Sequence, residues 1–254
     1  MMQANALGSL GAFGAAEAEL ARLEELANRT GKAYDQVALG YCRGMVWGGQ
    51  ARLDPAINAL EHAYELCRRH GFNLFLPLIA ATLSAMLVQA RQVSRASELA
   101  RAGLEVADRL GHNVARSAGA AALAAVRIAE ADHREAIRLA SEARSAAKAY
   151  GHRGVEVAAA RVLAQAFVAS NPADLERPIF VLREAIELGE SIEAIPAVAS
   201  CGLVLAGLLA KSGQRDDAIR DLRHMLRLTG EEMVVQTARL KSLLVELGGG
   251  VAPA

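Results

Sequence analysis

The feature that most constrains this chain of 254 residues is an internal repeat with a period of about forty residues. In each copy a small residue, usually alanine, opens a segment in which apolar residues recur every three or four positions. The later openings are separated by 40, 40, 42 and 40 residues, and one further period back reaches a sixth copy. A fixed period of this length is typical of stacked supersecondary units. The openings are Ala16, Ala56, Ala96, Ala136, Pro178 and Ala218.

A column of glycines with the same period marks where helices end. Gly31, Gly71, Gly111 and Gly151 each follow an amphipathic segment, and glycine past such a segment is a common helix C-terminal signal. Alanine makes up 54 residues while aromatic residues are only 4%, so helix formers dominate. We therefore expect two helices in each repeat, at 15–30, 32–50, 54–70, 73–91, 94–110, 113–131, 133–150, 153–170, 174–190, 192–212, 214–229 and 231–247.

Two columns of small residues run through the first helix of each pair. These positions predict close contacts between helix backbones, because small side chains one turn apart let helices approach. The fold class expected is all-α, a right-handed superhelical solenoid. One domain covers 1–247, with five to six repeats of which the first is incomplete, and 248–254 form a disordered tail. The columns are Gly40, Ala80, Ala120, Ala160 and Gly202, then Gly44, Ser84, Ala124, Ala164 and Ala206.

The repeat resembles the tetratricopeptide repeat (TPR) family. The spacing of its signature is found twice, once at Gly44, Trp47, Ala56, Leu60 and Ala63, and again at Ala206, Gly213, Ala218 and Leu222. The period is longer than the family's usual value of about 34 residues. This longer variety is similar to the helical arrays of maltose-regulator-type transcription activators and of bacterial adenylate cyclases fused to ATPase modules. The resemblance implies a protein-binding or regulatory module of bacterial signalling, not a catalyst.

Charge and cysteine usage restrict the partners and the compartment. Twenty-eight basic residues balance 28 acidic ones, so no net field favours nucleic acid or anionic lipid. We expect neither nucleic acid nor a membrane as a partner, and interpret the uncharged stretches 72–90 and 194–210 as buried helices. The three cysteines are odd in number and lack paired spacing, which favours a reducing, cytoplasmic location.

Chemical motifs do not point to an enzyme. The sequence contains no phosphate-binding loop, nucleophile elbow or metalloprotease histidine pair. His70, His112 and His152 lie one repeat apart, too far for one metal ion whose bonds are about 2 Å long. Cys67 precedes His70 at a ligand-like spacing, but we interpret these histidines as turn residues near helix ends. We therefore expect no catalytic residues, no cofactor and no metal.

The candidate binding surface is the free face of the first helices, which is small and apolar with few polar groups. We expect it to bind a partner protein segment or another copy of the chain, acting as an interaction scaffold or regulatory module. An alternative is a small-molecule sensor with Tyr41, Trp47, Arg161 and Gln165 around a pocket. An incomplete first repeat would expose Leu20, Leu23 and Leu26, which predicts a homodimer or an upstream domain. The candidate site residues are Tyr41, Met45, Trp47, Leu78, Gln89, Arg161, Gln165 and Lys211.

Overall fold

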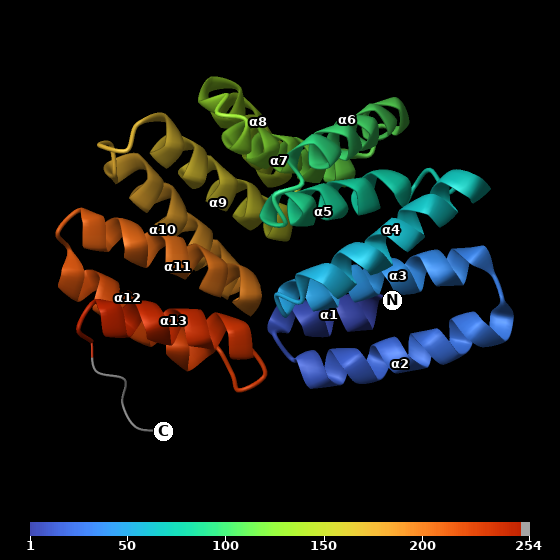
Figure 1. The fold of residues 1–254 in the computed structure, drawn as a ribbon, viewed down its shortest axis with the longest axis horizontal. Coiled ribbons are helices and arrows are strands. Elements are labelled where there is room, and N and C mark those ends of the chain that lie inside the picture. Colours follow the sequence, from blue (N-terminus) through green and yellow to red (C-terminus); the bar gives the residue numbers. More distant parts are fainter. Residues whose placement is uncertain (250–254) are drawn as a thin grey trace.

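The computed structural model describes residues 1–249, which form thirteen α-helices and no strand (Figure 1). All helices are connected by short turns, so consecutive helices pack as antiparallel neighbours. Their bounds are α1 Met2–Leu10, α2 Phe13–Thr30, α3 Ala33–Gly49, α4 Leu53–His70, α5 Leu76–Gln89, α6 Val93–Leu110, α7 Asn113–Ala129, α8 His133–Ala149, α9 Arg153–Ser170, α10 Glu176–Ser191, α11 Ile195–Lys211, α12 Arg215–Leu228 and α13 Val234–Glu246.

The twelve helices expected from the repeat are all present, as α2 to α13, and the prediction of an all-α solenoid is confirmed. The N-terminal stretch differs from expectation, because Met2–Leu10 is helical despite its glycine. Ala4 and Gly8 of α1 are buried, and a Cβ at Gly8 would lie 3.1 Å from Val46 on α3. Glycine is accepted here because the contact leaves no room for a side chain, and α1 thus completes the first helix pair.

The glycine column follows the second helices α2, α4, α6 and α8, as the sequence predicts. Gly31, Gly71, Gly111 and Gly151 adopt left-handed conformations with φ between 63° and 70°. Along the same turns, the backbone amide of the glycine or of the next residue donates to a carbonyl of the last helical turn. These caps satisfy carbonyl groups that a helix end would otherwise leave without a partner.

The helices form two layers. The first helices of the pairs, α3, α5, α7, α9 and α11, each pack between the second helix of their own repeat and that of the preceding repeat. Small residues bring these layers together: a Cβ on Gly40 would lie 2.9 Å from both the Ala59 carbonyl oxygen and the Ala63 Cβ. Buried Ser84 donates a hydrogen bond of 2.8 Å from its hydroxyl to the Ala96 carbonyl on α6. The small-residue columns therefore mark close helix contacts.

The chain follows a circuit in which its two ends meet. In Figure 1 the C-terminal helices, drawn in red, come back beside the blue N-terminal helices, and α1 contacts α11. The Gly14 amide donates to the Glu232 carboxylate at 2.7 Å, and the Gln236 side-chain amide donates to the Gly49 carbonyl. Met233, only 1% exposed, has its sulfur within 2.9 Å of where a Gly11 Cβ would stand. We call this set of contacts the closure.

The stacking of the first helices is uneven along this circuit. Helix α7 packs extensively against both α5 and α9, whereas α3 touches α5 and α9 touches α11 only over short lengths. None of the helices within residues 1–249 combines the length and apolarity needed to cross a bilayer. Of the tail predicted to be disordered, Gly248 forms a turn with Leu247 after α13, the Gly249 amide donates to the Leu244 carbonyl, and 250–254 lie outside the described residues.

Candidate functional site

The candidate site is the face of the first helices that points away from the second helices, which we call the inner face. Each of the helices α3, α5, α7, α9 and α11 packs against two second helices, and the residues that stay partly exposed recur every three or four positions along the helix. Most of its residues are half-buried and small, so peptide main chain could approach the helices closely. The residues that form it are Tyr41, Met45, Leu78, Thr82, Ala85, Ala118, Ala125, Ala158, Arg161, Gln165, Ser200, Val204 and Gly207.

Aromatic side chains gather where α3 meets α5. The chain has only ten Phe, Tyr and Trp residues, and four of them are here. The ring centroids of Tyr34 and Phe75 lie 5.4 Å apart, those of Tyr34 and Phe72 5.9 Å, and those of Tyr41 and Phe75 6.5 Å, all edge to face. Half of the Tyr34 surface is exposed, and neighbouring Leu74 is 68% exposed. We call Tyr34, Tyr41, Phe72 and Phe75 the aromatic cluster.

The Tyr41 hydroxyl links this cluster to the inner face. Burial raises the pKa of Tyr41, and a hydrogen bond with Thr82 offsets part of that effect. The phenol is therefore neutral at physiological pH and offers a hydroxyl group. Met45, one turn further along α3, is 38% exposed, with its sulfur 4.0 Å from the Thr82 hydroxyl. The structure thus brings Tyr41 and Met45 together on one surface, in accordance with the sequence.

Arg161 and Gln165 supply the polar groups of the inner face on α9. They lie one turn apart, with 3.5 Å between an Arg161 Nη1 and the Gln165 Oε1. Within the described residues Arg161 forms no ion pair. Arg43 on α3 and Arg127 on α7, by contrast, each pair with a glutamate. The charge of Arg161 is close enough to Cys201 on α11 to oppose the rise of that thiol's pKa. Both predicted residues are therefore half-buried and available on the inner face.

Trp47 lies on the other side of α3 and was wrongly placed with Tyr41 and Met45. Its Nε1–H donates to the Glu17 carboxylate at 3.0 Å, and the guanidinium of Arg52 donates to the same oxygen at 3.0 Å. The guanidinium carbons of Arg43 and Arg52 lie 5.5 and 5.1 Å from the indole ring. This network ties α2 to α3, and Trp47 lines an outer cavity of about 370 Å³ between α3 and α4. Trp47 is two positions after Met45, which is about 200° of helix rotation.

The remaining predicted residues divide in the same way. Leu78 is half-buried on the inner face of α5, as expected. Gln89 and Lys211 are exposed and are the last residues of α5 and α11, so they lie at helix ends away from the centre of the face. The four contacts proposed for a small-molecule pocket are not brought together, because Trp47 faces outward and two first helices, α5 and α7, lie between α3 and α9.

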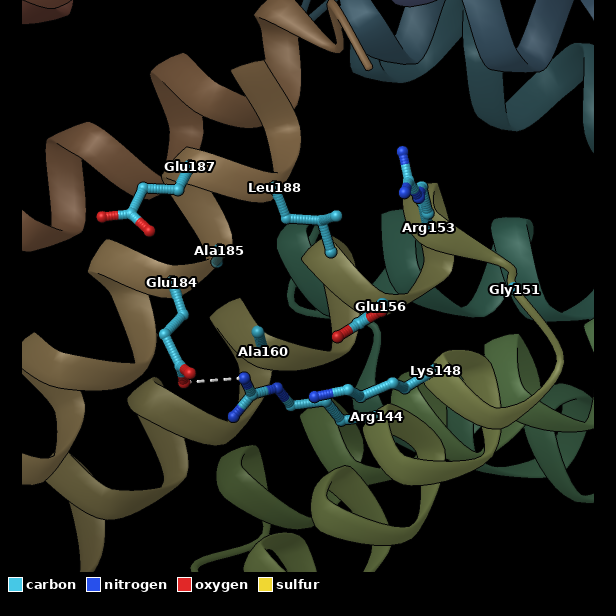
Figure 2. A pocket seen from close by; sticks show the side chains of 10 residues that line it. All are labelled: Arg144, Lys148, Gly151, Arg153, Glu156, Ala160, Glu184, Ala185, Glu187 and Leu188. Atoms are coloured by element: carbon cyan, nitrogen blue, oxygen red, sulfur yellow. Dashed lines mark hydrogen bonds and ion pairs between the residues drawn. The ribbon is translucent and has the colours of Figure 1, made fainter. Parts of the chain in front are cut away.

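A charged cavity that the sequence analysis missed opens on the outer side, over α8, α9 and α10. Its volume is about 510 Å³, and Arg144 pairs with Glu184 across it at 2.9 Å (Figure 2). The two residues are on the second helices of successive repeats and are 40 positions apart. The openings of these two repeats, Ala136 and Pro178, are 42 positions apart, so the two residues occupy nearby but not equivalent repeat positions. Opposite charges about one repeat apart on successive second helices are the signal that could have located the cavity. Its other charged lining residues are Lys148, Arg153, Glu156 and Glu187.

Two of the turn histidines stack on aromatic rings, and the cysteines are buried. His70 stacks on Phe72 with centroids 5.6 Å apart, and His152 stacks on Tyr150 at 6.0 Å. Within residues 1–249 no group of three His, Cys, Asp or Glu side chains is close enough to hold a metal ion. The three cysteines are buried and unpaired, and burial raises the pKa of each thiol to about 11. A thiol with this pKa is protonated and a poor nucleophile at neutral pH.

The fold and the face define a TPR-like helical repeat protein. No family model matches the chain, and no curated protein sequence matches it significantly. Among solved structures it is similar to a Rap protein complexed with competence and sporulation factor, with a TM-score of 0.73 and 14% identity over 89% of this chain. It is also similar to NprR in complex with its cognate peptide NprX, with a TM-score of 0.69 and 12% identity over 92% of this chain.

A third similar structure is the aspartyl phosphate phosphatase F from Bacillus subtilis, with a TM-score of 0.64, at 14% identity over 89% of this chain. The chain spans 66%, 65% and 60% of the lengths of these three proteins. At such low identity the similarity establishes the fold alone.

Proposed function

We propose that this chain is a regulatory interaction module that binds a short peptide or a peptide segment of a partner protein on its inner face. The observation that carries the proposal is the inner face itself. It is lined with small residues and lies between the aromatic cluster, on α3 and the turn before α5, and the polar pair on α9. Small side chains leave the room that a bound main chain requires, and aromatic rings supply apolar anchor sites. Two proteins of similar fold have been crystallised with a peptide or a factor bound.

The proposal does not include catalysis. The buried thiols are protonated, and the charged groups of the outer cavity balance one another, with three basic and three acidic side chains. We further propose a reducing, cytoplasmic location, because three buried thiols without partners suit such a compartment. The forty-residue period supports a relationship to the long-repeat arrays of bacterial transcription activators and adenylate cyclases.

Peptide selection tests this function directly. A display library of random heptapeptides is selected on the immobilised full chain, and enriched peptides are synthesised for fluorescence polarisation. Ala158 is exposed on the inner face, so Ala158→Trp is expected to weaken peptide binding at least tenfold without unfolding the protein. Ala18→Trp, on the exposed side of α2, is the matched control and should leave Kd unchanged. Failure to enrich any peptide, or equal effects of the two substitutions, would refute the proposal.

Self-association remains a prediction. The prediction rested on the exposure of Leu20, Leu23 and Leu26, and the structure weakens that argument. Leu20 is only 3% exposed, Leu23 is partly buried, and only Leu26 is clearly exposed, at 41%. Sedimentation equilibrium of the wild type and of Leu23→Glu distinguishes a dimer through the N-terminal end from a monomer. A monomeric mass for the wild type at high concentration would exclude the dimer.

A further inference from the structure

The first helices carry an excess of positive charge although the whole chain is neutral. Helices α3, α5, α7, α9 and α11 together contain six basic residues and two acidic ones. Both acidic residues, Asp35 and Glu156, are in the first turn of their helix, and Asp35 accepts a hydrogen bond from Thr30. The central part of the inner face therefore holds no carboxylate.

Arg161 is the basic residue of the inner face whose charge is not paired with a carboxylate in the described residues. Arg43 is paired with Glu24 at 2.6 Å, and Arg127 is paired with Glu130. Arg161 instead lies half-buried among small residues, within hydrogen-bond distance of Gln165 only. A guanidinium in such a setting is well suited to a carboxylate, which it can bind through two parallel hydrogen bonds.

Gln165 complements this charge. Its side-chain amide can donate to and accept from the main chain of an extended peptide, and it lies one turn from Arg161 on the same helix. The two side chains together match an acidic residue and the peptide group next to it. The rest of the inner face is apolar, and its aromatic cluster suits a bulky side chain.

Resting on the proposed function, we propose that the peptide recognised by the inner face is largely apolar and carries one acidic side chain that binds Arg161. A bulky apolar side chain of the same peptide packs on the aromatic cluster. Neighbouring packed helices are about 8–10 Å apart, so α5 and α9 are separated by roughly 16–20 Å. An extended chain covers about 3.3 Å per residue, which places the acidic residue about five or six positions from the apolar anchor.

The selected heptapeptides test this specificity. We expect Asp or Glu to be enriched five or six positions from a bulky apolar residue. Replacing that Asp by Asn in a synthetic peptide should raise Kd about tenfold, because hydrogen bonds between charged groups are stronger than neutral ones. The peptide substitution leaves the protein unchanged, so this measurement does not depend on the folding of a variant.

Protein variants then identify the partner of the acidic residue. Arg161→Gln should weaken the Asp peptide about tenfold and abolish its advantage over the Asn peptide, while Arg161→Lys should keep part of that advantage. Arg153→Gln is the matched control, since Arg153 is on the same helix but lines the outer cavity. Circular dichroism verifies that each variant is folded.

The outcomes separate this inference from the function on which it rests. If no peptide is enriched, the proposed function fails. If peptides bind to the inner face without a preference for acidic residues, or if Arg161→Gln retains the preference, the recognition by Arg161 is wrong while the proposed function stands.

Discussion

Replacing Gly40 by alanine tests whether the small-residue columns hold the helix layers together. The new methyl group would stand 2.9 Å from the Ala59 carbonyl oxygen and 2.9 Å from the Ala63 Cβ. Carbon atoms pack best at about 3.5–4.0 Å, so α3 and α4 would have to separate by several tenths of an ångström. Neither contact is the end of a flexible side chain, so the strain cannot be relieved by a rotamer change. Overpacking of this kind costs about 1–3 kcal/mol.

The same substitution also has a favourable component. Alanine stabilises a helix interior by about 1 kcal/mol relative to glycine. The net expectation for Gly40→Ala is therefore a loss of about 1 kcal/mol in the free energy of unfolding. Gly207→Ala is the matched control, because Gly207 is inside α11 and has nothing within 4 Å of its Cβ position. That variant should gain up to about 1 kcal/mol.

The two variants should therefore move in opposite directions in urea unfolding followed by circular dichroism. In thermal unfolding, a change of 1 kcal/mol in the free energy of unfolding shifts Tm by about 2–4 °C for a chain of this size. Equal slopes of the unfolding transitions are needed for the comparison, because repeat arrays can lose two-state behaviour. A Gly40→Ala variant that is as stable as Gly207→Ala would show that α3 and α4 are not held by backbone contact, and would refute the reasoning.

Three further predictions concern packing, buried thiols and the outer network. Ala120→Leu should lower the free energy of unfolding by about 1–3 kcal/mol, and with it the urea midpoint, because Ala120 packs on a cluster of buried alanines; an unchanged midpoint would place Ala120 in solvent. The pKa of the buried cysteines is about 11 in the folded chain and 9.0 in an exposed thiol. The contribution of these thiols to the free energy of unfolding should therefore be constant below pH 9 and fall between pH 9 and 11. A free energy of unfolding that does not change between pH 9 and 11 would contradict this. Glu17→Ala removes the acceptor shared by Trp47 and Arg52 and should lower the free energy of unfolding by about 1 kcal/mol. Glu105→Ala, in an exposed ion pair, should lower it by less than about 0.5 kcal/mol in the same chemical unfolding assay. Equal losses would show that the hydrogen bonds to Glu17 do not stabilise the fold.

The repeat predicted most of the fold because its signals are local. A glycine such as Gly71 ends a helix through its own backbone conformation, so its position in the sequence is sufficient. Helix α1 was missed because its stability comes from burial of Gly8 against Val46, 38 positions away, and not from local propensity. The closure depends on pairs as distant as Gly14 and Glu232, for which a repeat pattern contains no information.

The candidate site was predicted in part for the same reason. Tyr41, Met45, Leu78, Arg161 and Gln165 follow from their repeat positions, since stacking places equivalent residues on one face. Trp47 was included as a possible ligand contact, and its angle around the helix, about 200° from Met45, was not considered. The aromatic cluster was missed because Phe72 and Phe75 belong to the turn before α5, where the repeat specifies neither conformation nor contacts.

The closure also determines where unfolding starts. An open array of repeats frays from its two terminal units, because each has one neighbour instead of two. Here the first and last units are each other's second neighbour, so neither end can open without losing contacts at the other. The contact of α1 with α11 across the closure is short, like those of α3 with α5 and of α9 with α11, so local opening is expected first at these three joints. Amide hydrogens in the terminal helices should then exchange together with those at the two inner joints, whereas the ends of a linear solenoid exchange first.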